Sequence, residues 1–246
     1  MVQEFRVEDI VTPEAHSESW AALKSTRPQG HFILPSGEGY WGPNMTSKAG
    51  YFACINPLLA SPELFRPIGE RPVFLDLGSG TGLPVILAAR QGWKAVGVEA
   101  NEKCFRASQD NLTRAFLTGE FELTNIPRLL FGSYFPNGFD AQRFPDDPDR
   151  DPWAAQGISQ ALDQNAMRVN YSDAGIELGE VDLFYHFQWD NLDNLLGLFS
   201  RYAKPGAILG LCGDGRKDDY ERVPSNIEYL PSSFSEWVNF HYYRRS

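Results

Sequence analysis

A glycine-rich turn is the most informative feature of this sequence. Residues 78–82 read Gly-Ser-Gly-Thr-Gly, and Asp76 stands two positions before them. Glycine lacks a Cβ atom and tolerates positive φ, so such a turn lets a ligand approach the backbone closely. A helix that begins after the turn would add free N–H groups and the positive end of its dipole. The predicted ligand contacts here are Asp76, Gly78, Ser79, Gly80, Thr81, Gly82 and Leu83.

Two further acidic residues stand where apolar runs end. Glu99 closes the run Lys94–Glu99, and Asp173 follows the run Met167–Tyr171. If these runs are parallel strands, their carboxyl ends meet at the edge of the sheet where ligands bind. The residues expected around the ligand are then Asp76, Glu99, Ala100, Asp173 and Ala174.

Two kinds of ligand fit a glycine turn. A dinucleotide would place its pyrophosphate on the turn and its ribose hydroxyls on Glu99. The dinucleotide fingerprint, however, has glycine or alanine at the position that Leu83 occupies here. A ligand with cationic groups would instead be held by the carboxylates, and three acids around one site favour that alternative.

Two candidate catalytic residues, Tyr185 and His186, stand near the end of the apolar run Val181–Phe187. Ligands bind at the carboxyl ends of strands in open α/β sheets, so Tyr185 is also a candidate cofactor contact. Histidine has a pKa suited to general base catalysis. The alternative is structural, because aromatic side chains on such a strand usually pack in the core. No cluster has metal-ligand spacing, so no metal site is predicted.

The elements that position these residues alternate between strand and helix. Strand patterns at 72–77 and 94–99 are each followed by a helical pattern, at 83–91 and 101–116. This βαβα unit predicts an α/β fold with a mostly parallel, doubly wound sheet. The other expected strands lie at 167–171, 181–187, 207–212, 227–230 and 237–243. Because no helix separates the last two, they predict an antiparallel C-terminal hairpin.

The chain divides into an N-terminal helical cap or lid, residues 1–69, and an α/β domain, residues 70–246. Within that domain, residues 118–165 interrupt the alternation with prolines and a cluster of acids. We interpret this stretch as an insertion, because prolines and turn residues at this density exclude one regular element. It is either a lid over the ligand or a surface excursion.

The charge and cysteine content of the sequence limit the kinds of partner and the cellular compartment that we expect. The 246 residues include 22 Lys and Arg against 32 Asp and Glu, a net charge of −10. An acidic body repels polyphosphate, so nucleic acid is an unfavourable partner. Three isolated cysteines, a start without signal-peptide character and the lack of a long apolar run predict a cytoplasmic protein outside the membrane.

The motifs together resemble the class I S-adenosylmethionine-dependent methyltransferases. Residues 74–82 are similar to the family's first motif and residues 96–99 to its second. Residues 172–174 are similar to its third motif, and Ala203-Lys204-Pro205-Gly206-Ala207 is similar to its turn before strand five. Residues 185–189, Tyr-His-Phe-Gln-Trp, depart from the Asn/Asp-Pro-Pro-Tyr motif of amide and base methylation.

This resemblance implies a Rossmann-like domain with a seven-stranded sheet of order 3-2-1-4-5-7-6. It implies S-adenosylmethionine as cofactor, with Glu99 on the ribose and Asp173 near the adenine. The expected activity is methyl transfer to a small molecule or a protein side chain. A nicotinamide-dependent oxidoreductase and a catalytically silent, cofactor-binding regulatory protein remain alternatives. The sequence leaves the acceptor atom and the oligomeric state open.

Overall fold

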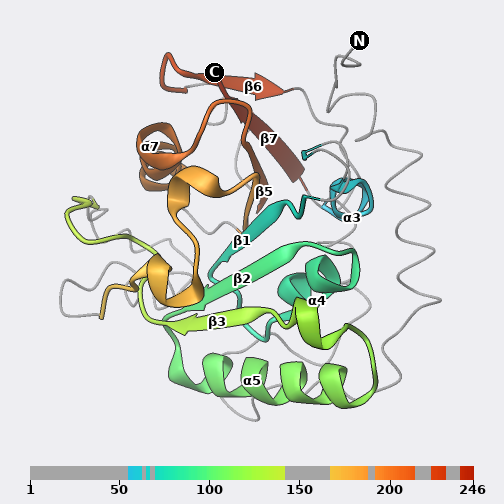
Figure 1. Ribbon diagram of the computed structural model, residues 1–246. Helices are drawn as coiled ribbons and strands as arrows, with labels where there is room; N and C mark the ends of the chain where they lie inside the picture. The colour runs from blue at the N-terminus through green and yellow to red at the C-terminus, as the bar shows by residue number, and fades with distance from the viewer. Residues whose placement is uncertain are drawn as a thin grey trace.

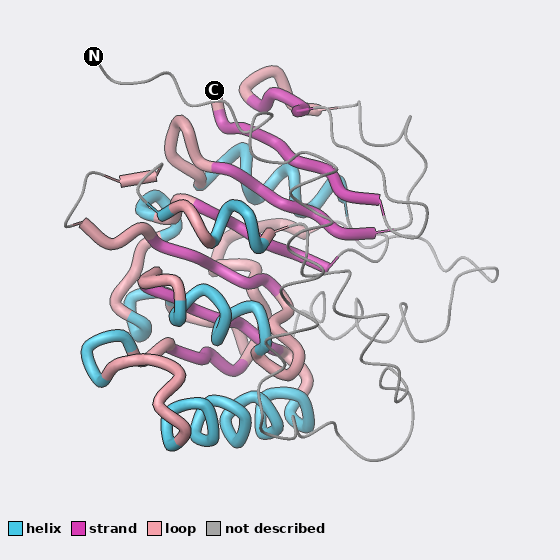
Figure 2. The backbone as a smooth tube through the Cα atoms, turned by 90° about the vertical axis from the view of Figure 1, so that its right-hand side faces the viewer, coloured by secondary structure: helices cyan, strands magenta, loops and turns pink. Residues whose placement is uncertain are grey.

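The computed structural model describes residues 55–62, 65–66, 70–141, 167–187, 192–213, 223–230 and 239–246. Their strands form a seven-stranded sheet of order β3-β2-β1-β4-β5-β7-β6 (Figures 1 and 2). The strands are β1 (Val73–Leu77), β2 (Lys94–Glu99), β3 (Arg128–Phe131), β4 (Leu183–Phe187), β5 (Ile208–Gly213), β6 (Ile227–Leu230) and β7 (Asn239–Arg245). The predicted strand order is confirmed.

The sheet is parallel from β3 to β5 and antiparallel at its other end. β1 pairs in parallel with β2 and with β4, while β7 runs antiparallel to both β5 and β6. Both the mostly parallel sheet and the antiparallel C-terminal pair are therefore as predicted. All five residues of β1 are buried, as expected for a parallel strand that is covered on both faces.

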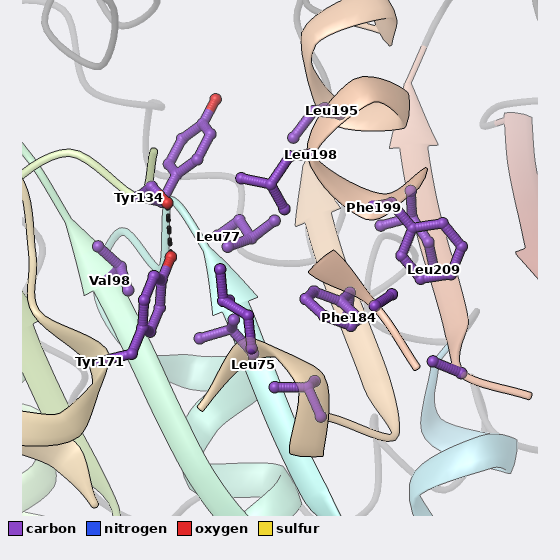
Figure 3. Close-up of a cluster of buried hydrophobic side chains, with 14 of the residues drawn as sticks. Leu75, Leu77, Val98, Tyr134, Tyr171, Phe184, Leu195, Leu198, Phe199 and Leu209 are labelled. Atoms are coloured by element: carbon purple, nitrogen blue, oxygen red, sulfur yellow. Dashed lines mark hydrogen bonds between the residues drawn. The ribbon is translucent and has the colours of Figure 1, made fainter. Parts of the chain in front are cut away.

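Helices cover both faces of the sheet. One face packs against α3 (Asn56–Leu59), α4 (Leu83–Arg90) and the last turns of α5 (Glu102–Leu117). The opposite face packs against α7 (Leu192–Tyr202) and the short 3₁₀ helices η4 (Tyr171–Ala174) and η5 (Leu178–Glu180). Figure 3 shows this second cluster, in which the rings of Phe184 and Phe199 meet edge-on with centroids 5.3 Å apart. No helix within the described ranges is both long and apolar enough to cross a bilayer.

The third strand is not where the sequence pattern predicted it. β3 lies at Arg128–Phe131, inside the stretch interpreted as an insertion, and it follows the 3₁₀ helix η3 (Leu123–Asn125). In the described part of this segment, residues 167–171, one isolated bridge forms, between Ser133 and Arg168. An edge strand has one partner, so four residues that are partly exposed suffice for β3.

That correction shortens the predicted insertion. Residues 118–141 belong to the regular fold, and only residues 142–166 fall between it and the next described segment. The rest of the predicted insertion at 118–165, residues 142–165, and most of the predicted N-terminal cap at 1–69, residues 1–54, 63–64 and 67–69, lie outside the described residues. α3 falls within the cap boundary of 1–69, and its residues Leu58 and Leu59 are buried in the core.

A buried carboxylate joins three parts of the chain at the amino end of the sheet. Asp182, which precedes β4, is only 3% exposed. Its oxygens accept hydrogen bonds from Arg66 Nε at 3.0 Å, Lys204 Nζ at 2.5 Å and the Val73 backbone N–H at 2.8 Å. Arg66 and Lys204 also donate to the Glu180 carbonyl. One carboxylate thus fixes the starts of β1 and β4 and the turn before β5.

Candidate functional site

The glycine turn follows β1 at the carboxyl end of the sheet. Gly78, Gly80 and Gly82 have φ of 82°, 55° and 82°, the left-handed region in which glycine is favoured. The backbone N–H groups of Gly78 and Ser79 donate to the Val98 carbonyl at 2.9 and 2.8 Å, which ties the turn to β2. α4 begins directly after it, and its N-cap residue is Gly82, which has no side chain. Its N-terminal N–H groups thus lie beside the turn, as predicted.

Glu99, the last residue of β2, holds the tip of this turn. Its two carboxylate oxygens accept from the N–H groups of Gly80 and Asn101, each at 2.7 Å. The side chain is 9% exposed, and burial raises its pKa while these backbone bonds oppose the rise. Each carboxylate oxygen has a second lone pair, so Glu99 retains capacity to accept from a ligand's hydroxyls.

Asp76 presents an unpaired oxygen under the turn. In the sheet it lies between Gly97 of β2 and Tyr185 of β4, and it is 1% exposed. Its Oδ2 and the Oγ of Ser79 are buried atoms that have no hydrogen-bond partner in the part of the chain that is described. Burial, and then the nearby Glu99 charge, raise the pKa of Asp76 well above its usual value. Unpaired buried polar atoms in a native fold call for a partner, such as a ligand or an ordered water.

Gly97 on β2 has no side chain, and this allows Ser79 of the glycine turn and Val85 of α4 to pack directly against the strand. A Cβ atom at that position would lie 2.8 Å from Val85 Cγ2 and 2.9 Å from both Cβ and Oγ of Ser79. We therefore expect Gly97→Ala to lower the free energy of unfolding by about 1–3 kcal/mol through overpacking. Urea denaturation followed by circular dichroism measures it.

A glycine with room around it provides the control. Among the described residues, a Cβ on Gly179 would approach only the Tyr202 carbonyl, at an ordinary 3.8 Å. Gly179→Ala should therefore change the free energy of unfolding by no more than about 0.5 kcal/mol. Equal effects at positions 97 and 179 would show that the turn does not depend on the missing side chain.

His186 lies beside the start of the turn. It pairs with Leu77 across β4 and β1, and its Nδ1 is hydrogen-bonded to the Leu77 carbonyl. The imidazole ring also contacts the Tyr134 ring edge-on, with centroids 5.4 Å apart. Burial lowers the pKa of His186 to about 4, so the side chain is neutral at physiological pH.

The lowered pKa predicts an acid-dependent loss of stability. The unfolded chain, with a histidine pKa near 6.5, binds a proton that buried His186 refuses, so stability falls as the pH drops from about 7 towards 4. Between pH 7 and 5 the native protein should lose about 2 kcal/mol more than His186→Phe, which has no proton to bind. Urea denaturation of both proteins at the two pH values tests this, and an equal loss in both would contradict it.

The other predicted residues are placed differently. Tyr185 is 1% exposed and packs in the core cluster under α3 and α4, the arrangement that the structural alternative described. Ala100 follows Glu99 and is half-buried. A catalytic or cofactor-binding role for Tyr185 and a cofactor contact of Ala100 stay predictions.

The reasoning that placed Asp173 and Ala174 beside Glu99 is wrong, because the third strand does not end there. Both lie in η4, and Asp173 is exposed and accepts a hydrogen bond from Asn170. Lys94, the first residue of β2, donates to the Gly175 carbonyl. The end of η4 therefore reaches the amino end of the sheet, away from the glycine turn.

The loop that begins at Gly132, at the carboxyl end of β3, lies beside Glu99 instead, and the sequence analysis did not predict it. The Gly132 N–H donates to the Glu99 carbonyl at 2.9 Å, and the Ser133 N–H donates to Met167. The Tyr171 hydroxyl reaches up to the Tyr134 carbonyl at 2.5 Å (Figure 3). The apolar run Leu129–Phe131 between Pro127 and Gly132 was the available signal for this strand and its loop. In the described ranges, no group of three His, Cys, Asp or Glu residues could hold a metal ion.

The strand order and the glycine turn after β1 together define the class I methyltransferase fold. Neither a protein-family model nor a curated protein matches the sequence. Solved structures do match, at low identity. An RNA methyltransferase from Salinibacter ruber, in complex with S-adenosyl-L-homocysteine, is 16% identical over 77% of this chain and 90% of that chain, with a TM-score of 0.43.

Two further solved structures are similar to a comparable degree. A SAM-dependent methyltransferase from Agrobacterium tumefaciens is 13% identical over 80% of this chain and 62% of that chain, with a TM-score of 0.44. The mitomycin 7-O-methyltransferase is 12% identical over 93% of this chain and 61% of that chain, with a TM-score of 0.40.

Proposed function

We propose that this protein is an S-adenosylmethionine-dependent methyltransferase that acts on a small molecule or a protein side chain. The observation that carries the proposal is the pairing of the glycine turn with Glu99 across β1 and β2. Glu99 already holds Gly80 and Asn101, and its remaining lone pairs suit two ribose hydroxyls. The unpaired Asp76 Oδ2 and Ser79 Oγ fit a ligand that carries hydrogen-bond donors.

The charge of this end of the sheet agrees with that cofactor. Asp76 and Glu99 stand on neighbouring strands, and the charge of Glu99 adds to the burial that raises the pKa of Asp76. A bound sulfonium and ammonium would stabilise the ionised carboxylates, whereas a pyrophosphate would be repelled by them. Leu83 occupies the position that the dinucleotide fingerprint gives to glycine or alanine, which counts against the oxidoreductase alternative.

The cofactor supplies an activated methyl group on a sulfonium, which is its own leaving group. The chain's task is to bind both reactants and align the accepting atom with the methyl carbon and the sulfur. In this proposal the turn from Gly78 to Gly82 holds the amino-acid end and Glu99 the ribose. A net charge of −10 supports a small molecule or a protein side chain as acceptor over nucleic acid. The isolated cysteines, with Cys104 and Cys212 unbridged, support a cytoplasmic site of action.

Calorimetry of the purified full chain tests the proposal. S-adenosylhomocysteine should bind with one site per chain, and NAD should show no heat of binding under the same conditions. Binding of NAD without S-adenosylhomocysteine would favour the oxidoreductase instead. Methyl transfer from labelled S-adenosylmethionine is then measured on small-molecule, protein and RNA pools. Cofactor binding with no transfer to any pool would favour the silent regulatory protein.

A further inference from the structure

The imidazole of His186 is held in one tautomer. Its Nδ1 faces the Leu77 carbonyl, and a carbonyl oxygen can only accept a hydrogen bond. Nδ1 must therefore carry the proton. In a neutral imidazole the other nitrogen, Nε2, then has a lone pair and no proton. No hydrogen-bond partner of Nε2 occurs within the described ranges, and 8% of the residue remains exposed.

His186 and its Nε2 lone pair lie at the carboxyl ends of β1 and β4, two central strands of the sheet. His186 Cε1, the atom next to Nε2, lies 3.6 Å from where a Cβ on Gly78 would be. The ring therefore borders the turn that we assign to the cofactor. Ligands of open α/β sheets bind at this end of the strands. Leu77, which pairs with His186 across the sheet, directly follows Asp76 on β1.

The surroundings keep His186 uncharged. Tyr134, a titratable side chain, contacts this ring edge-on, with centroids 5.4 Å apart. On β1 and β2, Asp76 and Glu99 are the nearest acids along the sheet, and neither contributes to the pKa of His186. Burial is the main cause that sets this pKa at about 4. Such an imidazole accepts a hydrogen bond at neutral pH but holds a full proton poorly.

We propose that Nε2 of His186 accepts a hydrogen bond from the methyl-accepting group of the substrate, which restricts acceptors to N–H or O–H groups. This inference rests on the proposed function. During transfer the bond between the methyl carbon and sulfur breaks, and sulfur keeps the electron pair. The lone pair of the accepting nitrogen or oxygen forms the new bond to carbon. The hydrogen bond to His186 orients that lone pair, and the proton of the cationic product then leaves to water.

The tautomer is the first test and needs no substrate. Long-range ¹H–¹⁵N spectra of the full chain saturated with S-adenosylhomocysteine should show His186 protonated at Nδ1 and bare at Nε2 from pH 8 to 5. A His186→Gln spectrum assigns the signal. A protonated Nε2 at pH 7 would overturn the inference. Failure of S-adenosylhomocysteine to bind at all would instead refute the proposed function, so the two failures are distinguishable.

Paired acceptor probes are the second test. Phenol and indole carry the O–H or N–H group, and anisole and N-methylindole are the same molecules after methylation. In the presence of S-adenosylhomocysteine, at least one donor probe should shift the Nε2 signal and bind about tenfold more tightly than its methylated partner, the scale of one hydrogen bond. Equal binding of donor and methylated probes would overturn the inference.

Variants show whether that preference depends on His186. His186→Phe keeps a ring and should abolish the donor preference, while S-adenosylhomocysteine affinity should stay within about threefold. His186→Gln retains an oxygen acceptor and should restore part of the preference. Tyr229→Phe, on β6 beside His241, is the control and should leave the preference unchanged. A preference that survives in His186→Phe would overturn the assignment.

Discussion

Replacing Asp182 with alanine should lower the free energy of unfolding by about 3–5 kcal/mol, the cost of removing one partner from a buried charge pair. Asp182 is 3% exposed and accepts from Arg66, Lys204 and the Val73 N–H. The alanine variant would leave two cations without their carboxylate and one buried N–H unsatisfied. Because Arg66 and Lys204 are about a quarter exposed, water can recover part of the loss. Urea denaturation measures the change.

Two comparisons separate this network from a general effect of losing an acid. Asp173→Ala removes an exposed carboxylate in η4 and should change stability by no more than about 0.5 kcal/mol. Asp182→Asn keeps the shape and one acceptor oxygen, so its loss should fall between the other two. A loss below about 1 kcal/mol for Asp182→Ala would mean that the network contributes little to stability. Because Asp182 lies at the amino end of the sheet, folded variant protein should still bind cofactor.

The central strands of the sheet were predictable because their sequence pattern is typical of buried parallel strands. β1 and β2 are buried on both faces and read as short continuous apolar runs, each followed by a helical pattern. The C-terminal pair was predictable because two strands without an intervening helix must run antiparallel. In each case the local pattern and the tertiary environment agree.

The edge of the sheet was harder to predict for a physical reason. β3 needs only one neighbour, and its first and last residues are exposed while the two residues between them are half-buried. The run that was predicted to be this strand, Met167–Tyr171, alternates apolar and polar residues as strands do, but Tyr171 begins a 3₁₀ helix that packs across the face of the sheet. The periodicity of the sequence therefore favoured Met167–Tyr171 as the strand, although that segment covers the core and β3 lies elsewhere.

The residues of the candidate site were predictable only where the strand that carries them was predictable. The turn, Asp76 and Glu99 lie at the carboxyl ends of β1 and β2, as the sequence pattern indicated, because those two strands were assigned correctly. Asp173 is misplaced because its strand was. The hydrogen bond from Gly80 to Glu99 and the tautomer of His186 depend on contacts between neighbouring strands. Such contacts are set by the register of the sheet, which composition does not specify.

Glu99→Ala should weaken S-adenosylhomocysteine binding by about 100-fold or more, measured by calorimetry. The proposed ribose contact and the turn depend on the same carboxylate, because its oxygens hold Gly80 and Asn101 at 2.7 Å. Hydrogen bonds to a charged group contribute about 1.5–3 kcal/mol each, and about 2.7 kcal/mol corresponds to 100-fold in affinity. The alanine variant loses the ribose contacts and releases the tip of the turn, so both effects act in one direction.

Glu99→Gln distinguishes the two contributions. Glutamine keeps the length of the side chain, but one oxygen becomes an NH₂ group that cannot accept from either Gly80 or Asn101. It should bind S-adenosylhomocysteine more weakly than the native protein and more tightly than Glu99→Ala. Adenosine, which has the ribose but no amino-acid end, should also bind more weakly to this variant if Glu99 acts on the ribose. If adenosine affinity is unchanged while S-adenosylhomocysteine affinity falls, Glu99 acts only by holding the turn, and the ribose contact is wrong.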